Sequence, residues 1–432
     1  MKLNALSAAI YGALFLGLVL AYRFELPRFD YWDVVYRSTY VVIADPSSVV
    51  AYLFRGNESM MVVPKLFIYL SNTLAPRSAL LVEHAATLLL GACSHVLLLR
   101  ILRLPLVPGA GIELATVLRW WLVLLLFWWP AVLPTYTNTW FAVQYGLTLY
   151  FGLLAVHVYQ RSGGRGARLV LSYVAWLAAG MTHGTGLLLG PALALVAGLR
   201  DRRWYFAVVL FLGTTLVLWV QHLVSRGVVH NLQRFDSPLS LDSLKFMARV
   251  VTPPIWETAL FALVVAPLLL LTVWLCFRHS QSFLEKPYFV LILWGLAVWL
   301  SIWFARGGFQ SHANPHYLRF FVVVYAAWVM MLLDFVWPRL PMSAAAWAGC
   351  ALFLVIWLKG VDAGVSLAAS YQNQIRAGTA VLRGESGDRE SLRYLYPDTE
   401  KLTDLFVPRL AGTRGRIYGE LVGPGTETRD GS

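Results

Sequence analysis

Two aspartates stand three residues apart with two aromatic residues between them, in the run Leu26-Pro27-Arg28-Phe29-Asp30-Tyr31-Trp32-Asp33-Val34. If the segment is helical after Pro27, Asp30 and Asp33 share one face. Such carboxylates could act as a general base and a partner that orients an acceptor, or could together hold a cation. An interfacial belt of Tyr31 and Trp32 beside solvated aspartates explains the same pattern, because two aspartates at this spacing are a weak signal.

Membrane helices must position these residues. Of the 432 residues, 58% are hydrophobic and only 13% are charged, whereas a soluble domain carries about 25% charged residues. The apolar residues form runs long enough to cross a hydrocarbon layer of roughly 30 Å. The net charge of +12 comes from basic residues scattered in short loops, which argues against nucleic-acid binding and for topology signals.

The apolar runs predict an all-α protein with eleven transmembrane helices, near 5–22, 79–99, 119–134, 140–159, 169–183, 185–199, 204–224, 257–277, 288–305, 318–337 and 342–361. Arginines gather in alternate loops, as the positive-inside rule expects of cytoplasmic connections. The N-terminus is therefore expected in the cytoplasm and the C-terminus outside. The count depends on 169–199 being a broken hairpin, because both of its flanks are Arg-rich.

The expected division is a transmembrane domain over 1–361 and an outer tail over 362–432, with packed helices and a disordered end after Gly423. Three further stretches face outward: 23–78, 225–256 and 306–317. Within the first, the apolar segment from Met60 to Leu74 is interrupted by Pro64-Lys65 and is too short to span. We expect it to lie flat on the outer interface and cover a cavity.

The first outer loop resembles that of the GT-C type membrane glycosyltransferases, in particular a set of bacterial polytopic proteins. That set has a D-x-W-D-like pattern, then an H-N-E-H-R-like motif and a Pro-containing amphipathic helix. The matching residues are Asp30, Trp32 and Asp33, then Asn57 and Glu58, then Pro64. Gly56 and Ser59 stand where the family usually has histidines. Helix number and loop placement are similar along most of the chain.

The resemblance implies a GT-C-like fold in a bacterial inner membrane, with the tail in the periplasm. It also implies transfer of a sugar from a polyprenyl-phosphate donor to a glycan, lipid or exported protein, with inversion at the anomeric carbon. By carry-over, Asp30 is the first candidate for the base and Asp33 the second. Glu58, with Asn57 beside it, would position the acceptor or the base.

A phosphate leaving group needs positive charge, and the loop before the tenth predicted helix supplies Arg306, His316 and Arg319. Arg319 lies at the outer end of that helix, where positive charge is not expected. The family tends to carry an R-Y-like pair here, so the resemblance leaves the phosphate ligand open between these residues. An arginine that snorkels to lipid headgroups is the alternative interpretation of Arg319.

His183, beside glycines at the outer tip of the predicted hairpin, is a candidate for contacting substrate. The cofactor is unknown: two aspartates and a glutamate could bind Mg²⁺ or Mn²⁺, or work without a metal. The rival functions are a transporter or flippase of lipid-linked glycans, and an enzyme of the O-antigen ligase or polymerase type. A transporter is expected to carry polar residues deep in several helices and paired repeats.

Overall fold

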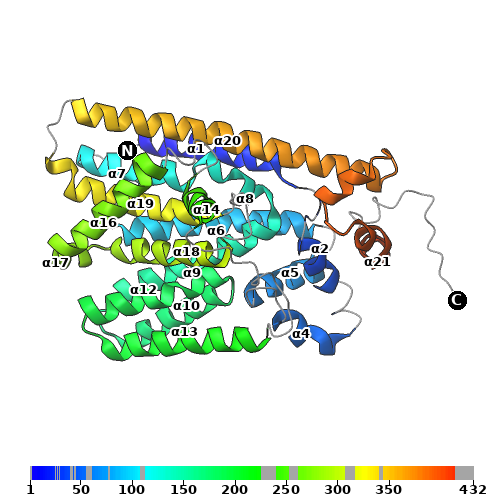
Figure 1. The fold of residues 1–432 in the computed structure, drawn as a ribbon, viewed down its shortest axis with the longest axis horizontal. Helices are drawn as coiled ribbons and strands as arrows, with labels where there is room; N and C mark the ends of the chain where they lie inside the picture. The colour runs from blue at the N-terminus through cyan, green and yellow to red at the C-terminus, as the bar shows by residue number, and fades with distance from the viewer. Residues whose placement is uncertain are drawn as a thin grey trace.

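The computed structural model describes residues 2–24, 26, 28, 30–38, 42, 45–54, 61–75, 78–107, 112–224, 240–252, 261–306, 317–339 and 344–413. These residues form helices and turns, with no strand among them, so the predicted all-α class is confirmed. The helices run mostly along the long axis of the molecule (Figure 1). Each helix satisfies its backbone hydrogen bonds within its own segment, as a hydrocarbon environment requires.

Seven apolar segments are long enough to cross a membrane by length and composition. They are α1 (Lys2–Tyr22), α6 (Ala79–Ile101), the combined α7 (Leu114–Phe127), η3 (Pro130–Val132) and α8 (Leu133–Thr137), α9 (Thr139–Gln160), α13 (Trp204–Val224), α19 (Leu318–Phe335) and α20 (Ala344–Leu382).

Shorter apolar helices occupy the four remaining predicted spans. They are α10 (Gly166–Gly180), the series α11 (Gly184–Leu187), α12 (Leu189–Leu195) and η4 (Val196–Arg200), then η5 (Phe261–Val265) with α16 (Ala266–Arg278), and α18 (Phe289–Arg306). Each predicted span thus coincides with an apolar helix.

The hairpin over 166–200 is present. Trp176 in α10 donates from its indole to the Leu187 carbonyl at 3.2 Å, so α11 folds back onto α10. At the other end of the hairpin, Arg203 donates to the Ser162 hydroxyl at 2.6 Å, which brings the two flanks together. Gly186 lies against the Ala179 backbone, where a Cβ would collide, and this close approach allows the tight turn.

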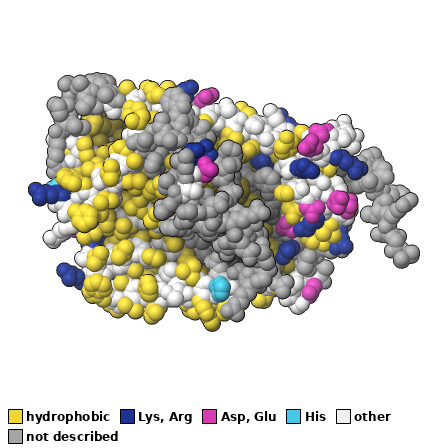
Figure 2. Space-filling view, in the orientation of Figure 1, with side chains coloured by type: hydrophobic (Ala, Val, Ile, Leu, Met, Phe, Trp, Pro, Cys, Tyr) yellow, Lys and Arg dark blue, Asp and Glu magenta, His cyan; other side chains and the backbone are white. Residues whose placement is uncertain are grey.

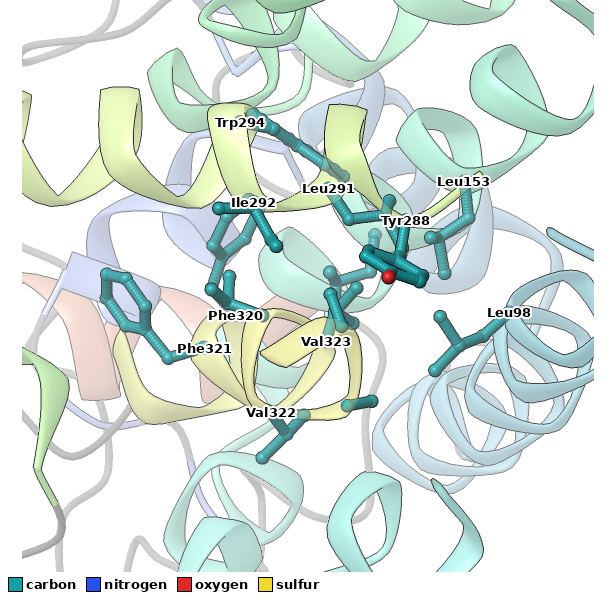
Figure 3. Close-up of a cluster of buried hydrophobic side chains, with 14 of the residues drawn as sticks. Leu98, Leu153, Tyr288, Leu291, Ile292, Trp294, Phe320, Phe321, Val322 and Val323 are labelled. Atoms are coloured by element: carbon teal, nitrogen blue, oxygen red, sulfur yellow. The ribbon is translucent and has the colours of Figure 1, made fainter. Parts of the chain in front are cut away.

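The centre of the bundle is a dry aromatic and aliphatic core in which α18 packs against α19 (Figure 3). Trp294 and Phe320 meet edge to face, with ring centroids 4.6 Å apart, a favoured arrangement of aromatic pairs. Gly295 leaves room for Val324 of the facing helix. Small residues let membrane helices approach closely, so this contact fixes where α19 begins relative to its neighbours.

The remaining helices lie outside these segments. In the first outer loop they are α2 (Asp30–Tyr36), η2 (Pro46–Ser48), α4 (Val49–Phe54) and α5 (Val62–Leu74); later come α14 (Leu241–Val251), α17 (Ser280–Leu284) and η7 (Trp337–Arg339). In the tail they are η8 (Arg389–Tyr394), η9 (Lys401–Phe406) and α21 (Val407–Thr413). Figure 1 places α2, α4, α5 and α21 at one end of the bundle, and α16 and α17 at the other.

Two predicted boundaries change. The last helix does not end near residue 361 but continues to Leu382, because Gly360 and Gly364 lie flush against Trp129 and Pro130 and hold it on the bundle. Pro64 does not interrupt α5, since it occupies the first turn, where its missing N–H has no helical acceptor. The predicted disordered end after Gly423 lies outside the described residues.

The first outer loop and the tail share a second hydrophobic core, separate from that of the bundle. Its buried members include Tyr31, Trp32, Ile68, Leu395, Leu402 and Phe406. Acidic and basic side chains lie together at this end in Figure 2, whereas much of the bundle's visible surface is apolar. We call this part of the molecule the loop-and-tail end, and the opposite end, with Arg119, Arg200 and Lys286, the Arg-rich end.

Candidate functional site

The helix α2 carries the aspartate motif and rests on the bundle through Tyr31. The Tyr31 hydroxyl donates to Glu83 near the start of α6, and its ring stacks on Trp140 with centroids 6.0 Å apart. Ser71 of α5 donates to the other oxygen of Glu83. A single carboxylate thus joins α2, α5 and α6.

Glu83 is the fifth residue of α6, at a position where a carboxylate could reach water from the helix end. The structure buries it completely, at 0% exposure. Its only signal in the sequence is an acidic residue inside an apolar run. Burial of a carboxylate is costly unless hydrogen bonds compensate, and the two hydroxyls of Tyr31 and Ser71 supply that compensation.

Asp33 faces the tail. Its Oδ1 lies 2.8 Å from the Lys401 ammonium, and its Oδ2 accepts from the Tyr396 hydroxyl at 2.5 Å. Burial alone would lower the pKa of Lys401, but the bonds to Asp33 and Tyr396 outweigh it and raise that pKa above its usual value. Burial and the bond to Asp33 raise the pKa of Tyr396 to about 12. Both partners therefore stay protonated at neutral pH.

Several predicted site residues are placed only in part. Asp30 is the first residue of α2 and Arg306 the last of α18, but their side chains lie outside what the structure describes. Asn57, Glu58 and His316 lie outside the described residues altogether. Their predicted roles stay predictions.

Arg319 is at the predicted position, in the first turn of α19, and is 2% exposed. Its Nη1 donates to the Ala142 carbonyl at 3.2 Å, and its guanidinium carbon lies 3.9 Å from the centre of the Tyr136 ring. Gly146 leaves room for Nη2, whereas Nε has no hydrogen-bond partner among the described residues. The snorkelling interpretation is therefore wrong, because the side chain points into the protein.

No carboxylate of the described residues forms an ion pair with Arg319. A buried guanidinium usually has such a partner, because moving an unpaired charge out of water costs on the order of several kcal/mol, even after the surrounding protein relaxes. The carbonyl and the ring face offset part of that cost. They leave the positive charge without a described counterion at the N-terminal end of α19.

His183 lies in the same neighbourhood. Its Nδ1 accepts from the Thr185 backbone N–H at 3.2 Å, and its ring lies 5.0 Å from that of Tyr145. Tyr145 in turn meets Tyr317, two residues before Arg319, at 6.4 Å. The predicted hairpin tip and the start of α19 therefore meet beside the first turns of α9.

The first outer loop reaches the same place. Gln144 donates to the Met61 sulfur at 3.2 Å, and the Val63 N–H donates to the Met181 carbonyl at 3.3 Å. The first two turns of α9 consequently contact Tyr31 through Trp140, Arg319 through Ala142, and His183 through Tyr145. Two residues predicted for one site, Arg319 and His183, thus contact the first two turns of α9, and the first loop meets the same turns through Tyr31 and Met61.

Lys65 of α5 is a second buried cation at this end. Its ammonium donates to the Tyr52 carbonyl at 3.0 Å, and the residue is 6% exposed. Burial, with a smaller contribution from the charge of Arg37, lowers the pKa of Lys65 to about 8. Burial at this end therefore disfavours positive charge strongly enough to lower the pKa of a lysine. The positive charge of Arg319 is costly for the same reason.

A metal site is not assembled by the described side chains, among which no three His, Cys, Asp or Glu groups converge. Asp33 is committed to Lys401 and Glu83 to two hydroxyls. The predicted alternatives with and without Mg²⁺ or Mn²⁺ both stay open, since Asn57 and Glu58 lie outside the described residues.

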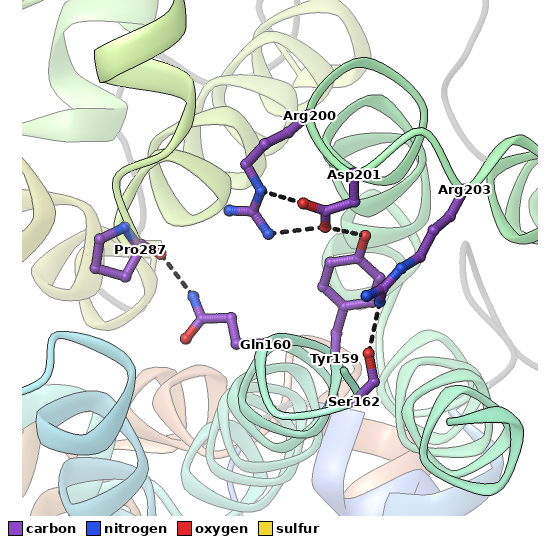
Figure 4. Close-up of polar contacts among 7 residues, drawn as sticks. All are labelled: Tyr159, Gln160, Ser162, Arg200, Asp201, Arg203 and Pro287. Atoms are coloured by element: carbon purple, nitrogen blue, oxygen red, sulfur yellow. Dashed lines mark hydrogen bonds and ion pairs between the residues drawn. The ribbon is translucent and has the colours of Figure 1, made fainter. Parts of the chain in front are cut away.

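The Arg-rich end holds another polar cluster, shown in Figure 4. Arg200 pairs with Asp201 at 2.7 Å, and the Tyr159 hydroxyl donates to Asp201 at 2.5 Å. Nearby, Asp334 pairs with Arg119 at 2.9 Å and with Lys286 at 2.8 Å. Basic and acidic side chains neutralise each other here, so we interpret this cluster as one that holds the helices together.

The chain matches no protein-family model, and neither a curated protein nor a solved structure is significantly similar to it. The functional argument therefore rests on the geometry of the site.

Proposed function

We propose that the chain is a multi-pass glycosyltransferase of the GT-C type, with eleven membrane crossings, in a bacterial inner membrane. It moves a sugar from a polyprenyl-phosphate donor to an acceptor at the loop-and-tail end, which faces the periplasm. The N-terminus then lies in the cytoplasm, together with the Arg-rich end, as the positive-inside rule expects.

The observation that carries the proposal is the buried charge of Arg319, which no described carboxylate neutralises. An anionic ligand that enters beside it would complete the site, and guanidinium is well suited to phosphate oxygens. Arg319 stands at the end of an apolar helix. A phosphate joined to a long hydrocarbon chain fits that position, because the chain can remain in the bilayer.

The chemistry follows from a charged leaving group and a base on opposite sides of the sugar. Asp30 removes the proton from an acceptor hydroxyl, the hydroxyl oxygen attacks the anomeric carbon, and the bond from that carbon to the phosphate oxygen breaks. Arg319 holds the departing phosphate, while Arg306 and His316 are candidates for further contacts. Attack from the face opposite the phosphate inverts the anomeric centre.

Binding of a polyprenyl phosphate to the full chain in nanodiscs tests the proposal. Arg319→Met should weaken binding by roughly 100-fold, as loss of a charge-assisted contact to a buried site does, while Arg319→Lys should weaken it less. Arg200→Met is the matched control, since it removes an arginine paired with Asp201 at the other end. Equal affinity in wild type and Arg319→Met contradicts the proposal.

A transfer assay with a labelled donor tests the base. Asp30→Asn should abolish transfer without weakening the binding of polyprenyl phosphate, because it removes the proton acceptor and leaves the phosphate contacts in place. If Asp30→Asn and Asp33→Asn both transfer sugar at the wild-type rate, the assignment of a first-loop base fails.

A second candidate, transport of a lipid-linked glycan, is favoured by one feature of α6. Polar side chains follow its buried side inward from Glu83 through His84, Thr87 and Ser94, and the atoms His84 Nδ1 and Ser94 Oγ have no hydrogen-bond partner in the described part of the chain. Intramembrane polar groups often mark a pathway. Movement of a fluorescent lipid-linked sugar across liposomes without acceptor supports transport, and its absence together with sugar transfer supports the enzyme.

A further inference from the structure

We propose that Lys401 and Tyr396 of the C-terminal tail are positioning residues for sugar transfer, acting through Asp33 on the helix that begins with Asp30. The inference rests on the proposed function and assigns the two aspartates different roles. Asp30 is the base, and Asp33 is the anchor by which the tail fixes α2.

Both carboxylate oxygens of Asp33 already have partners. Lys401 contacts Oδ1 at 2.8 Å and Tyr396 donates to Oδ2 at 2.5 Å, while Lys401 and Tyr396 also contact each other at 3.1 Å. A general base needs an oxygen directed at the acceptor hydroxyl. To act as the base, Asp33 would have to break its contacts with Lys401 and Tyr396 and free an oxygen. To anchor α2, it needs only the contacts that it already makes.

The tail presents these two side chains rigidly. The Lys401 ammonium lies 4.8 Å from the centre of the Phe406 ring, and Phe406 meets Tyr36 of α2 at 5.0 Å. Phe406 and Leu402 are fully buried in the core that the loop and tail share. Hydrophobic contacts therefore hold η9 against α2 independently of the ion pair, and the ion pair sets the orientation.

A second group of contacts with the tail holds the chain just before α2. Arg28 donates to the Gln374 side chain at 3.1 Å and to the Tyr394 carbonyl at 3.3 Å, and it lies 4.2 Å from the Tyr371 ring. On the opposite side, Tyr31 is bonded to Glu83 of the bundle. The helix α2 is thus held between the tail and the bundle, so a shift of the tail would move Asp30.

The experiment compares full-length variants in the transfer assay. Lys401→Met and Tyr396→Phe should each lower kcat by roughly 10- to 100-fold, the loss expected when a reacting group is displaced by about 1 Å, and leave the KM for donor almost unchanged. Lys401→Arg should restore most of the activity, because a guanidinium can still bind Asp33. Arg393→Met is the control: it removes an exposed pair of the same tail, with Glu390 at 3.8 Å.

Combining Lys401→Met with Asp33→Asn should cost no more activity than the larger single effect, because both act through one contact. A kcat of Lys401→Met equal to wild type, or a loss as large in Arg393→Met, overturns the positioning role. So does a loss in Asp33→Asn far beyond that of Lys401→Met, which would make Asp33 the base. Wild-type protein that transfers no sugar contradicts the proposed function and, with it, this role; transfer at the wild-type rate in Lys401→Met overturns the role alone.

Discussion

The partly buried charges of the Arg-rich end and the two fully buried charged residues Arg319 and Glu83 of the loop-and-tail end have different partners. At the Arg-rich end, Asp201 and Asp334 neutralise Arg200, Arg119 and Lys286 within 3 Å. At the loop-and-tail end, Arg319 has a carbonyl and an aromatic ring but no described carboxylate, and Glu83 has hydroxyls but no described cation. Charges that satisfy each other tie helices together, whereas an unneutralised charge costs stability and is expected where a ligand completes it.

The largest expected effect separates stability from activity at Arg319. Arg319→Met should reduce sugar transfer by roughly 100-fold or more, as loss of a charge contact to a leaving group does, and should not lower the free energy of unfolding in mixed micelles. Removal of an unneutralised buried charge relieves its desolvation cost. A large loss of stability in this variant would show that Arg319 is structural, and would remove the contrast between the two ends.

At the Arg-rich end the expected result is reversed. Asp334→Asn leaves Arg119 and Lys286 facing each other without a counterion, so the free energy of unfolding should fall by about 3 kcal/mol. The side chains of Arg119 and Lys286 are 31% and 34% exposed, so water screens their repulsion. The loss should therefore not exceed the lower end of the range for a buried pair. Donor binding should not change; weaker binding of polyprenyl phosphate would mean that the cluster does more than hold helices.

Lys65 gives a pH test of the loop-and-tail end. Burial lowers its pKa in the folded state to about 8, against the ordinary lysine value of 10.5. Between these values the unfolded chain holds a proton that the folded chain has lost, so stability should rise with pH. From pH 7.5 to 9.5 the gain is about 2 kcal/mol. Comparison with Lys65→Met isolates this group, and an equal gain in that variant would assign the effect elsewhere.

The smallest expected effect concerns Glu83. Glu83→Gln keeps a side-chain oxygen for Tyr31 or Ser71 and should change the free energy of unfolding little, whereas Glu83→Leu removes the acceptor that the two hydroxyls share and leaves Ser71 with its bond to the Ile68 carbonyl. The loss should be about 1 kcal/mol, because the deleted carboxylate itself was costly to bury. If Glu83→Leu proves more stable than wild type, the carboxylate is retained for function and resembles Arg319 more than Asp334.

Individual residues show how far sequence reasoning reached. The apolar runs predicted the positions of the long and shorter apolar helices, and Arg319 was singled out at the start of α19 because a cation was not expected there. Glu83 was passed over, since no local pattern distinguishes an acidic residue at a wet helix end from one covered by α2 and α5. The resemblance ranked Asp30 before Asp33 as the base, but no local pattern showed that Asp33 pairs with Lys401 of the tail.

By itself, the sequence determined the all-helical class, the placement of the apolar helices and the hairpin predicted over 169–199. These follow from hydropathy and loop charge, which are local properties of the chain. Only the tertiary structure decided that Lys401 reaches Asp33 across 368 positions, that the tail and the first loop share a core, and that Arg319 is buried without a carboxylate. Such contacts depend on which surfaces meet when the helices pack, and hydrophobic patterning does not encode that choice residue by residue.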